Sequence, residues 1–137
     1  MSSQQQREVQ IRSDNDIVAT RRTVRAVAQS LGFGITDVTR IVTATSELAR
    51  NVVLYAGSGV MRWRELGMNG RVGVELTLED NGPGIADIEQ VMQEGYTTSG
   101  GLGLGLPGTK RLMDEFEIAS EIGKGTRITV RKWRRQL

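Results

Sequence analysis

Apolar and polar residues alternate strictly over residues 71–80, RVGVELTLED, and this alternation predicts a half-buried β-strand. Aliphatic side chains stand at every second position: Val72, Val74, Leu76 and Leu78. They share one face of the strand, and the polar residues between them share the other. Residues 59–66 predict a second short strand, which the turn sequence GMNG at 67–70 connects to the first.

Two earlier stretches repeat apolar residues at helical spacing instead. The first covers residues 14–33, where Asp14 or Asp16 can cap the helix start. The second covers residues 36–57, with Thr36 as the expected cap. It carries one continuous stripe of inward-facing positions: Val38, Ile41, Val42, Thr45, Leu48, Ala49 and Val52. Both stretches end in glycines, as helices commonly do.

The other elements are shorter: an edge strand at 7–13, one short helix within 87–95, a helix at 107–116, and a hairpin at 117–133 that turns at 123–125. In the third of these we expect Leu112, Met113 and Phe116 to face inward. Helices and strands do not alternate regularly along the chain. The order therefore favours an α+β layered fold over a doubly wound sheet, in a single domain over residues 1–137.

Composition excludes several chemistries. The 137 residues include no cysteine and no histidine, which removes thiol catalysis, disulfides, Ser-His-Asp triads and a phosphohistidine in the same chain. No apolar run approaches the roughly 18 residues of a membrane span, so we expect a cytoplasmic protein without a membrane partner. The formal net charge of +2 is too small to indicate nucleic-acid binding. The basic residues near the end of the chain fit a solvated strand and tail.

A glycine-rich stretch, SGGLGLGLPGTK at 99–110, interrupts the polar segment before the last predicted helix. Glycines that precede a helix start suit a phosphate group, because bare backbone N–H groups there bind anions. Residues 103–108 match G-x-G-x-x-G, but no strand precedes them, so a dinucleotide site is improbable. The stretch alone also fits a flexible surface loop.

Asp80 ends the alternating strand, and Gly82 and Gly84 follow it at once. A carboxylate there can accept a hydrogen bond from the amino group of adenine, and the glycines let a flat ring approach the main chain. An Asx-type turn that ends the strand explains the same residues about equally well.

Glu47 and Asn51 lie four residues apart, so they share one flank of the second predicted helix. Taken alone, the pair is better explained as a solvated polar flank. A functional interpretation gives the side-chain oxygen of Asn51 to Mg²⁺ and makes Glu47 a general base.

Together, E-x-x-x-N, D-N-G-P-G, G-L-G-L-G-L and G-T occur in the order that resembles the GHKL superfamily of ATPases and kinases. The resemblance implies a two-layer α/β sandwich of the Bergerat fold, a mixed sheet with helices on one face, a mobile ATP lid from Ile85 to Gly100, and ATP and Mg²⁺ as cofactors. Asn51 would bind Mg²⁺, and Asp80 would bind adenine beside Thr126. The implied nucleotide-binding residues are Asn51, Asp80, Gly82, Gly84, Ile85, Gly100, Gly101, Leu102, Gly103, Leu104, Gly105, Leu106 and Thr126.

Within that superfamily, a free-standing domain of this length is similar to the anti-sigma-factor-type serine/threonine kinases, and most similar to stressosome switch kinases. The similarity implies that Glu47 activates a protein hydroxyl, that STAS-domain scaffold or antagonist proteins are substrates, and that the released kinase activates a PP2C-type phosphatase. The basic lid residue of the anti-sigma branch is missing from positions 97–100. Lys110 and Arg111 are the substitutes we expect at the γ-phosphate.

Two other functions fit the same motifs. The chain could be an anti-sigma factor kinase that sequesters a sigma factor and phosphorylates its antagonist. It could also be a non-catalytic module in which ATP closes the lid and selects the partner. The sequence leaves these alternatives open.

Overall fold

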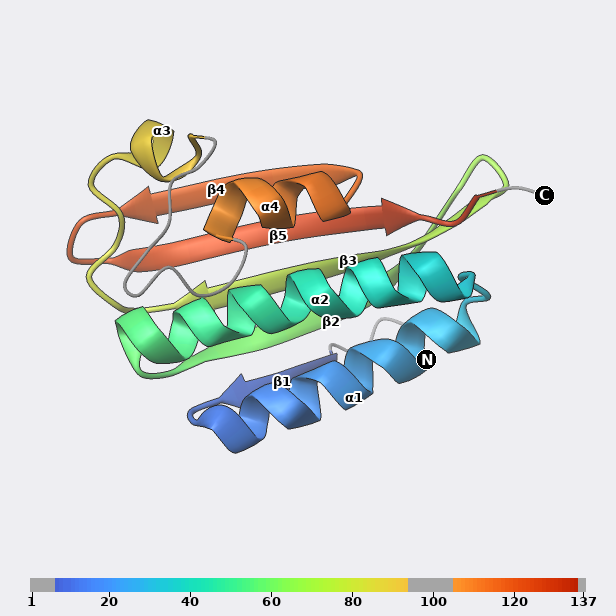
Figure 1. Cartoon of the computed structure of the whole chain (residues 1–137), viewed down its shortest axis with the longest axis horizontal. Helices are drawn as coiled ribbons and strands as arrows, with labels where there is room; N and C mark the ends of the chain where they lie inside the picture. The colour runs from blue at the N-terminus through green and yellow to red at the C-terminus, as the bar shows by residue number, and fades with distance from the viewer. Residues whose placement is uncertain (1–6, 94–104, 136–137) are drawn as a thin grey trace.

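The computed structural model describes residues 7–93 and 105–135. Helices cover one face of a five-stranded sheet (Figure 1). In chain order the elements are β1 (Arg7–Ile11), α1 (Asp14–Ser30), α2 (Ile35–Asn51), the π-helical η1 (Val52–Ala56), β2 (Gly59–Met68), β3 (Arg71–Asp80), α3 (Ile88–Val91), α4 (Gly105–Leu112), β4 (Glu115–Glu121) and β5 (Gly125–Trp133).

The strands lie in the order β1-β2-β3-β5-β4, with β1 at one edge as the sequence predicts. The α+β class is confirmed. The expectation of a mixed sheet is wrong, because all four neighbouring pairs among the described strands are antiparallel. Two of these pairs, β2–β3 and β4–β5, are hairpins, which are antiparallel by construction. Asn69 and Gly70 take positive φ angles of 54° and 78° in the first of these turns.

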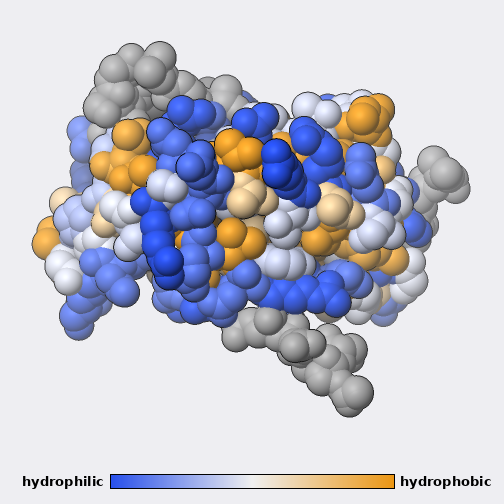
Figure 2. Space-filling view, turned by 90° about the horizontal axis from the view of Figure 1, so that it is seen from below, coloured by the Kyte–Doolittle hydropathy of each residue, from blue (hydrophilic) through white to orange (hydrophobic). Residues whose placement is uncertain are grey.

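The core forms where the apolar stripe of α2 meets the even-numbered side of β3. Every residue of the predicted stripe is buried, and so are Val74, Leu76 and Leu78. Both periodicities are thus confirmed. Seen from below in Figure 2, apolar side chains form separate groups among hydrophilic ones. None of the described helices has the length and apolar character needed to cross a bilayer.

The predicted helix ends need correction. Ser13, rather than Asp14 or Asp16, occupies the N-cap position of α1, and Gly34, rather than Thr36, precedes α2. Asp16 instead accepts a hydrogen bond of 2.7 Å from the backbone N–H of Arg12, which fixes the chain just before the helix. The α-helical part of the second helix ends at Asn51, and the remaining turn is π-helical. Such π segments are frequent at functional sites.

The last helix is also displaced from its predicted range. It begins at Gly105 and ends at Leu112, so Phe116 belongs to β4 and not to a helix. The change occurs because the backbone N–H of Asp114 already donates to the carbonyl of Arg131, at 2.9 Å, and so begins the pairing with β5. The short helix predicted within 87–95 is α3, where the carboxylate of Asp87 accepts from the N–H of Gln90 at 3.0 Å.

Aligned residues of the strands form rows across the helix-covered face of the sheet. One such row is wholly apolar: Met61, Leu78, Ile128 and Ile118. The next row, at the end of β3, consists of Gly59, Asp80, Thr126 and Ser120. The apolar face therefore turns polar at one end, where side chains with hydrogen-bonding groups lie next to the core.

Candidate nucleotide-binding site

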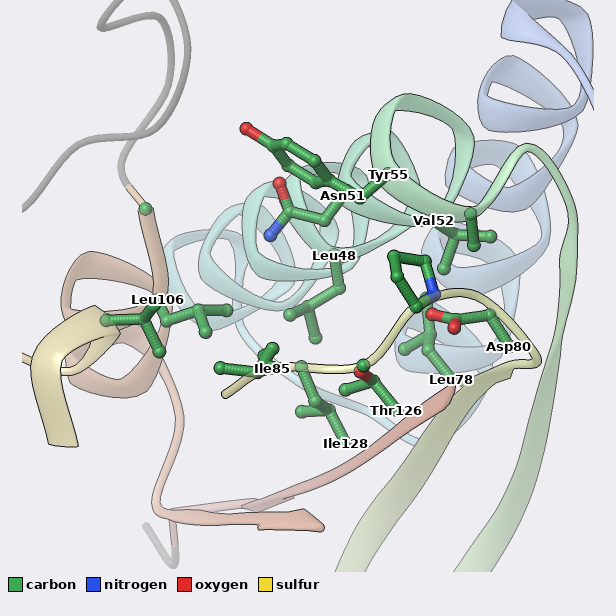
Figure 3. A pocket seen from close by; sticks show the side chains of 15 residues that line it. Leu48, Asn51, Val52, Tyr55, Leu78, Asp80, Ile85, Leu106, Thr126 and Ile128 are labelled. Atoms are coloured by element: carbon green, nitrogen blue, oxygen red, sulfur yellow. The ribbon is translucent and has the colours of Figure 1, made fainter. Parts of the chain in front are cut away.

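A cavity of about 280 Å³ opens at this polar end of the sheet. Its walls come from the end of α2 with η1, the loop after β3, the start of α4 and the start of β5 (Figure 3). The lining is mostly apolar with a few polar groups, as in small-molecule sites generally. The lining residues are Leu48, Asn51, Val52, Tyr55, Ala56, Leu78, Asp80, Pro83, Gly84, Ile85, Val91, Gly105, Leu106, Thr126 and Ile128.

Asp80 lies at one end of the cavity. Its Oδ1 accepts a hydrogen bond of 2.9 Å from the backbone N–H of Gly82, so the Asx-type turn weighed from the sequence is present. Asp80 lines the cavity as well. The two interpretations of this residue therefore do not compete, since the turn fixes the carboxylate and a carboxylate has capacity for further hydrogen bonds.

The loop after Asp80 fits closely against neighbouring backbone. Gly84 has a φ of +80°, and a Cβ there would overlap the carbonyl of Glu121 in the β4–β5 hairpin. A Cβ on Gly82 would lie 2.6 Å from that of Ala56. Glycine at both positions is required by space, and at Gly84 also by conformation. Gly82 does not itself line the cavity, whereas Gly84 and Ile85 do.

Ser120 ties this loop to the hairpin, and its role could not be inferred from the sequence. Its hydroxyl accepts from the N–H of Ile85 at 2.7 Å, donates to the carbonyl of Gly125 at 2.9 Å, and lies 2.9 Å from the hydroxyl of Thr126. With its single proton committed to Gly125, Ser120 can only accept from Thr126. The lone pairs of Thr126 are then left for the cavity.

Asn51 and Tyr55 face the cavity from the opposite wall (Figure 3). They lie one turn apart, at the junction of α2 and η1. Glu47 is half-buried one turn before Asn51. It does not line the cavity, although Leu48 beside it does. Tyr55 is a lining residue that the sequence analysis missed, because the π-helical turn that presents it leaves no periodic signal.

The start of α4 completes the wall with Gly105 and Leu106. The other expected phosphate-binding residues lie outside the described part of the chain: Gly100, Gly101, Leu102, Gly103 and Leu104. Lys110 and Arg111 are exposed and line a separate hollow with Met92 and Phe116. The described structure therefore does not bring these two cations to the cavity.

A metal ion would find few protein ligands here. Within the ranges that the structure describes, no three acidic or metal-binding side chains lie close enough together to hold one. Mg²⁺ commonly uses only one or two protein ligands and takes the rest from phosphates and water. A single amide oxygen from Asn51, at the rim of a nucleotide cavity, is compatible with that habit.

The protein is an α+β domain in which helices cover an antiparallel sheet and a cavity lies between an aspartate-ended strand and an asparagine-ended helix. Residues 36–136 match the model of the histidine kinase-, DNA gyrase B- and HSP90-like ATPase family. The chain belongs to this family, which uses ATP.

The relatives refine this assignment. The chain is 54% identical to the serine/threonine-protein kinase RsbT of Bacillus subtilis, over 93% of this chain and 96% of that protein. It is 33% identical to the anti-sigma F factor of Geobacillus kaustophilus, over 88% and 86%. Within its family, the chain is accordingly an enzyme of the serine/threonine-protein kinase type.

Solved structures share the fold at lower identity. The RsbU and RsbW domains of Rv1364c from Mycobacterium tuberculosis align with a TM-score of 0.63 at 19% identity, over 95% of this chain and 33% of that one. The mycobacterial sensor histidine kinase MprB aligns with a TM-score of 0.56 at 20% identity, over 96% and 99%. These likenesses confirm the expected architecture of helices on one face of a sheet.

Proposed function

We propose that residues 1–137 form one cytoplasmic, Mg²⁺-dependent protein kinase domain that transfers the γ-phosphate of ATP to serine or threonine residues of STAS-domain proteins. The observation that carries the proposal is that Asp80 of β3 and Asn51 of α2 line the same cavity. The 54% identity to the serine/threonine-protein kinase RsbT supports the reaction type. General-stress signalling is the setting in which we expect the enzyme to act.

The chemistry assigns one task to each part of the cavity. Asp80 accepts a hydrogen bond from the adenine amino group, beside Thr126 and above the close-packed glycine loop. Asn51 would offer its amide oxygen to Mg²⁺, and the ion would supply positive charge to offset that of the phosphates. Gly105 and Leu106, with the glycines before them, contact the phosphate chain. Lys110 and Arg111 remain predictions for the γ-phosphate, to be tested by substitution.

Glu47 is our proposed general base. It takes the proton from a substrate hydroxyl while that oxygen bonds to the γ-phosphorus, and the bond from phosphorus to the β-bridging oxygen breaks to release ADP. The products are the phosphorylated protein and ADP. Glu47 lies one helical turn before Asn51 on α2, next to the lining residue Leu48, and this proximity to the cavity supports the assignment.

A second activity belongs to the same proposal. Once its STAS-domain partners are phosphorylated and release it, the kinase binds and activates a PP2C-type phosphatase. The support for this step is the likeness to stressosome switch kinases alone, and the cavity has no direct part in it.

Incubation with Mg-ATP and the STAS-domain proteins of the source organism tests the proposal. Intact mass spectrometry counts the phosphates on each partner. We expect transfer by the wild type, loss of transfer in Asp80→Asn and Glu47→Gln, and unchanged transfer in the neighbouring control Glu79→Gln. Full transfer by Glu47→Gln would refute the assigned base. ATP binding without transfer to any partner would favour the nucleotide-gated binding module.

The anti-sigma factor kinase remains a second candidate because anti-sigma F factors align over 86–87% of their own length at about one-third identity. This candidate predicts a stable complex with a sigma factor. Size-exclusion chromatography of the chain with sigma factors, in the presence of ATP, distinguishes it from the switch kinase.

A further inference from the structure

Lys132 is a buried cation on the helix-covered face of β5. Its side chain is only 7% exposed, and it aligns with Val74 of β3. The ammonium group donates to the backbone carbonyl of Leu112 at 3.0 Å and lies 3.5 Å from Asp114 Oδ1 and 3.9 Å from Asp37 Oδ1. A buried charge is costly unless it is paired and hydrogen-bonded, so this position is specified by its partners.

The partners of Lys132 belong to different parts of the fold. Leu112 is the last residue of α4, Asp114 lies between α4 and β4, and Asp37 is in the first turn of α2. The carbonyls at the end of a helix lack partners within the helix and carry partial negative charge. Lys132 supplies both a donor and a positive charge to the end of α4, and so ties that helix to β5 and α2.

Asp37 does not depend on Lys132 alone. Arg40 lies 3.0 Å from its Oδ1, and Arg135 lies 3.8 Å from its Oδ2. The backbone carbonyl of Leu112, in contrast, accepts its hydrogen bond from Lys132 itself. Loss of the ammonium group would therefore affect the end of α4 more than the start of α2.

The opposite end of α4 carries cavity-lining residues. Gly105 and Leu106 lie at its first turn, and eight residues at about 1.5 Å each make the helix about 12 Å long. A short helix moves as a unit, so an anchor at its last carbonyl constrains its first residues. The base end of the cavity is held separately, through Ser120 and the contact of Gly84 with the hairpin.

We propose that Lys132 is a positioning residue for the phosphate side of the nucleotide site, which it sets from the far end of α4 without contacting the ligand. The proposal rests on the proposed function, since it takes ATP as the ligand and places its phosphates toward Gly105. It predicts that Lys132 matters for ligands with a phosphate chain and not for the nucleoside alone.

Calorimetric titration of the purified full chain with ATP and with adenosine tests this directly. In Lys132→Met, we expect the Kd for ATP to rise about tenfold, because a small displacement of binding groups is costly, while the Kd for adenosine changes less than about twofold. Val74→Ala is the matched control. It damages the same row of the sheet without touching the Leu112 carbonyl, and should leave the ratio of the two Kd values unchanged.

Asp114→Asn provides a milder variant if Lys132→Met does not fold. Asp114 is partly exposed, its replacement removes one charge beside the ammonium group, and the amide oxygen of Asn can still accept from the backbone N–H of Trp133. A rise of about threefold in the Kd for ATP alone is expected. Equal weakening of ATP and adenosine, or no change in either, would overturn the proposal. Failure of the wild type to bind either ligand would instead refute the proposed function.

Discussion

The two faces of β3 differ completely although they belong to one ten-residue strand. On the helix-covered face, Val74, Leu76 and Leu78 are buried, and Asp80, the next residue of the strand on that face, lines the cavity. On the open face, Glu75 and Glu79 bond to arginines of neighbouring strands. The covered face of β3 thus provides apolar side chains that stabilise the fold and also Asp80, the candidate adenine-binding residue. Asp80 is the first polar side chain after the apolar ones on that face.

The open face carries a network of charged side chains that no helix covers. Glu75 pairs with Arg64 at 2.7 Å and with Arg131 at 2.8 Å, and Arg131 extends the network to two glutamates of β4. Partly exposed ion pairs are individually weak. The difference between the faces therefore predicts a descending series of effects when each is altered.

The largest effect is expected from Leu76→Ala, which opens a cavity between the buried side chains of the covered face. Deletion of a buried leucine side chain costs about 2–5 kcal/mol of unfolding free energy, and urea denaturation followed by circular dichroism measures it. Thr77→Ala on the open face is the control, since it removes one methyl group and a hydroxyl contact of 3.3 Å with Thr129 from a half-buried position, and should cost less than about 1 kcal/mol. Equal losses in the two variants would contradict the contrast between the faces.

The next effect concerns binding and not stability. Asn at position 80 can still accept the hydrogen bond from Gly82, so Asp80→Asn should leave the melting temperature nearly unchanged. It places an amide donor where the adenine amino group needs an acceptor, and loss of a charged hydrogen bond corresponds to about a 100-fold rise in the Kd for ATP.

Glu79→Gln tests whether position on the face decides this outcome. Glu79 is the neighbouring carboxylate, and it bonds to Arg62 at 2.9 Å on the open face. Isothermal titration calorimetry should give the wild-type Kd for this variant. A similar loss of ATP binding in both variants would mean that local negative charge governs recognition, and not the position of Asp80 on the covered face.

Periodic patterns predicted the covered face well. The alternation of 71–80 and the stripe of the second helix depend only on which residues are apolar, and burial followed in both cases. Asp80 is the next alternate residue after Leu78, so the alternation also places it on the covered face. Local sequence therefore determined the core and, through it, the position of the adenine-binding candidate.

Features that depend on contacts distant in sequence were missed or wrong. Phe116 continues a helical pattern in the sequence, but pairing with β5 makes it part of a strand. Ser120 accepts a hydrogen bond from the loop after β3, and Lys132 donates one to the end of α4. No sequence motif surrounds either residue. Lys110 and Arg111 were assigned to phosphate from their charge and their place after the glycines. They line a different hollow in the described structure, and the assignment stays a prediction.

The smallest effect is expected from Glu75→Gln on the open face, and it should depend on pH. The hydrogen bond from Arg64, together with Arg131, holds the pKa of Glu75 below its ordinary value of 4.5 in the folded protein. A lowered folded-state pKa stabilises the protein above the unfolded-state pKa, and this stabilisation is lost as the pH falls through the folded-state value. Glu75→Gln should therefore cost about 1 kcal/mol at neutral pH, and progressively less as the pH falls below 4.5 through the lowered folded-state pKa. Urea denaturation at a series of pH values measures the difference.

Glu117→Gln is the control, because Glu117 bonds to the same Arg131 at 2.7 Å but is 65% exposed, and it should cost less than about 0.5 kcal/mol at any pH. A pH-independent loss in Glu75→Gln would show that the side chain stabilises the open face by packing and not by its charge.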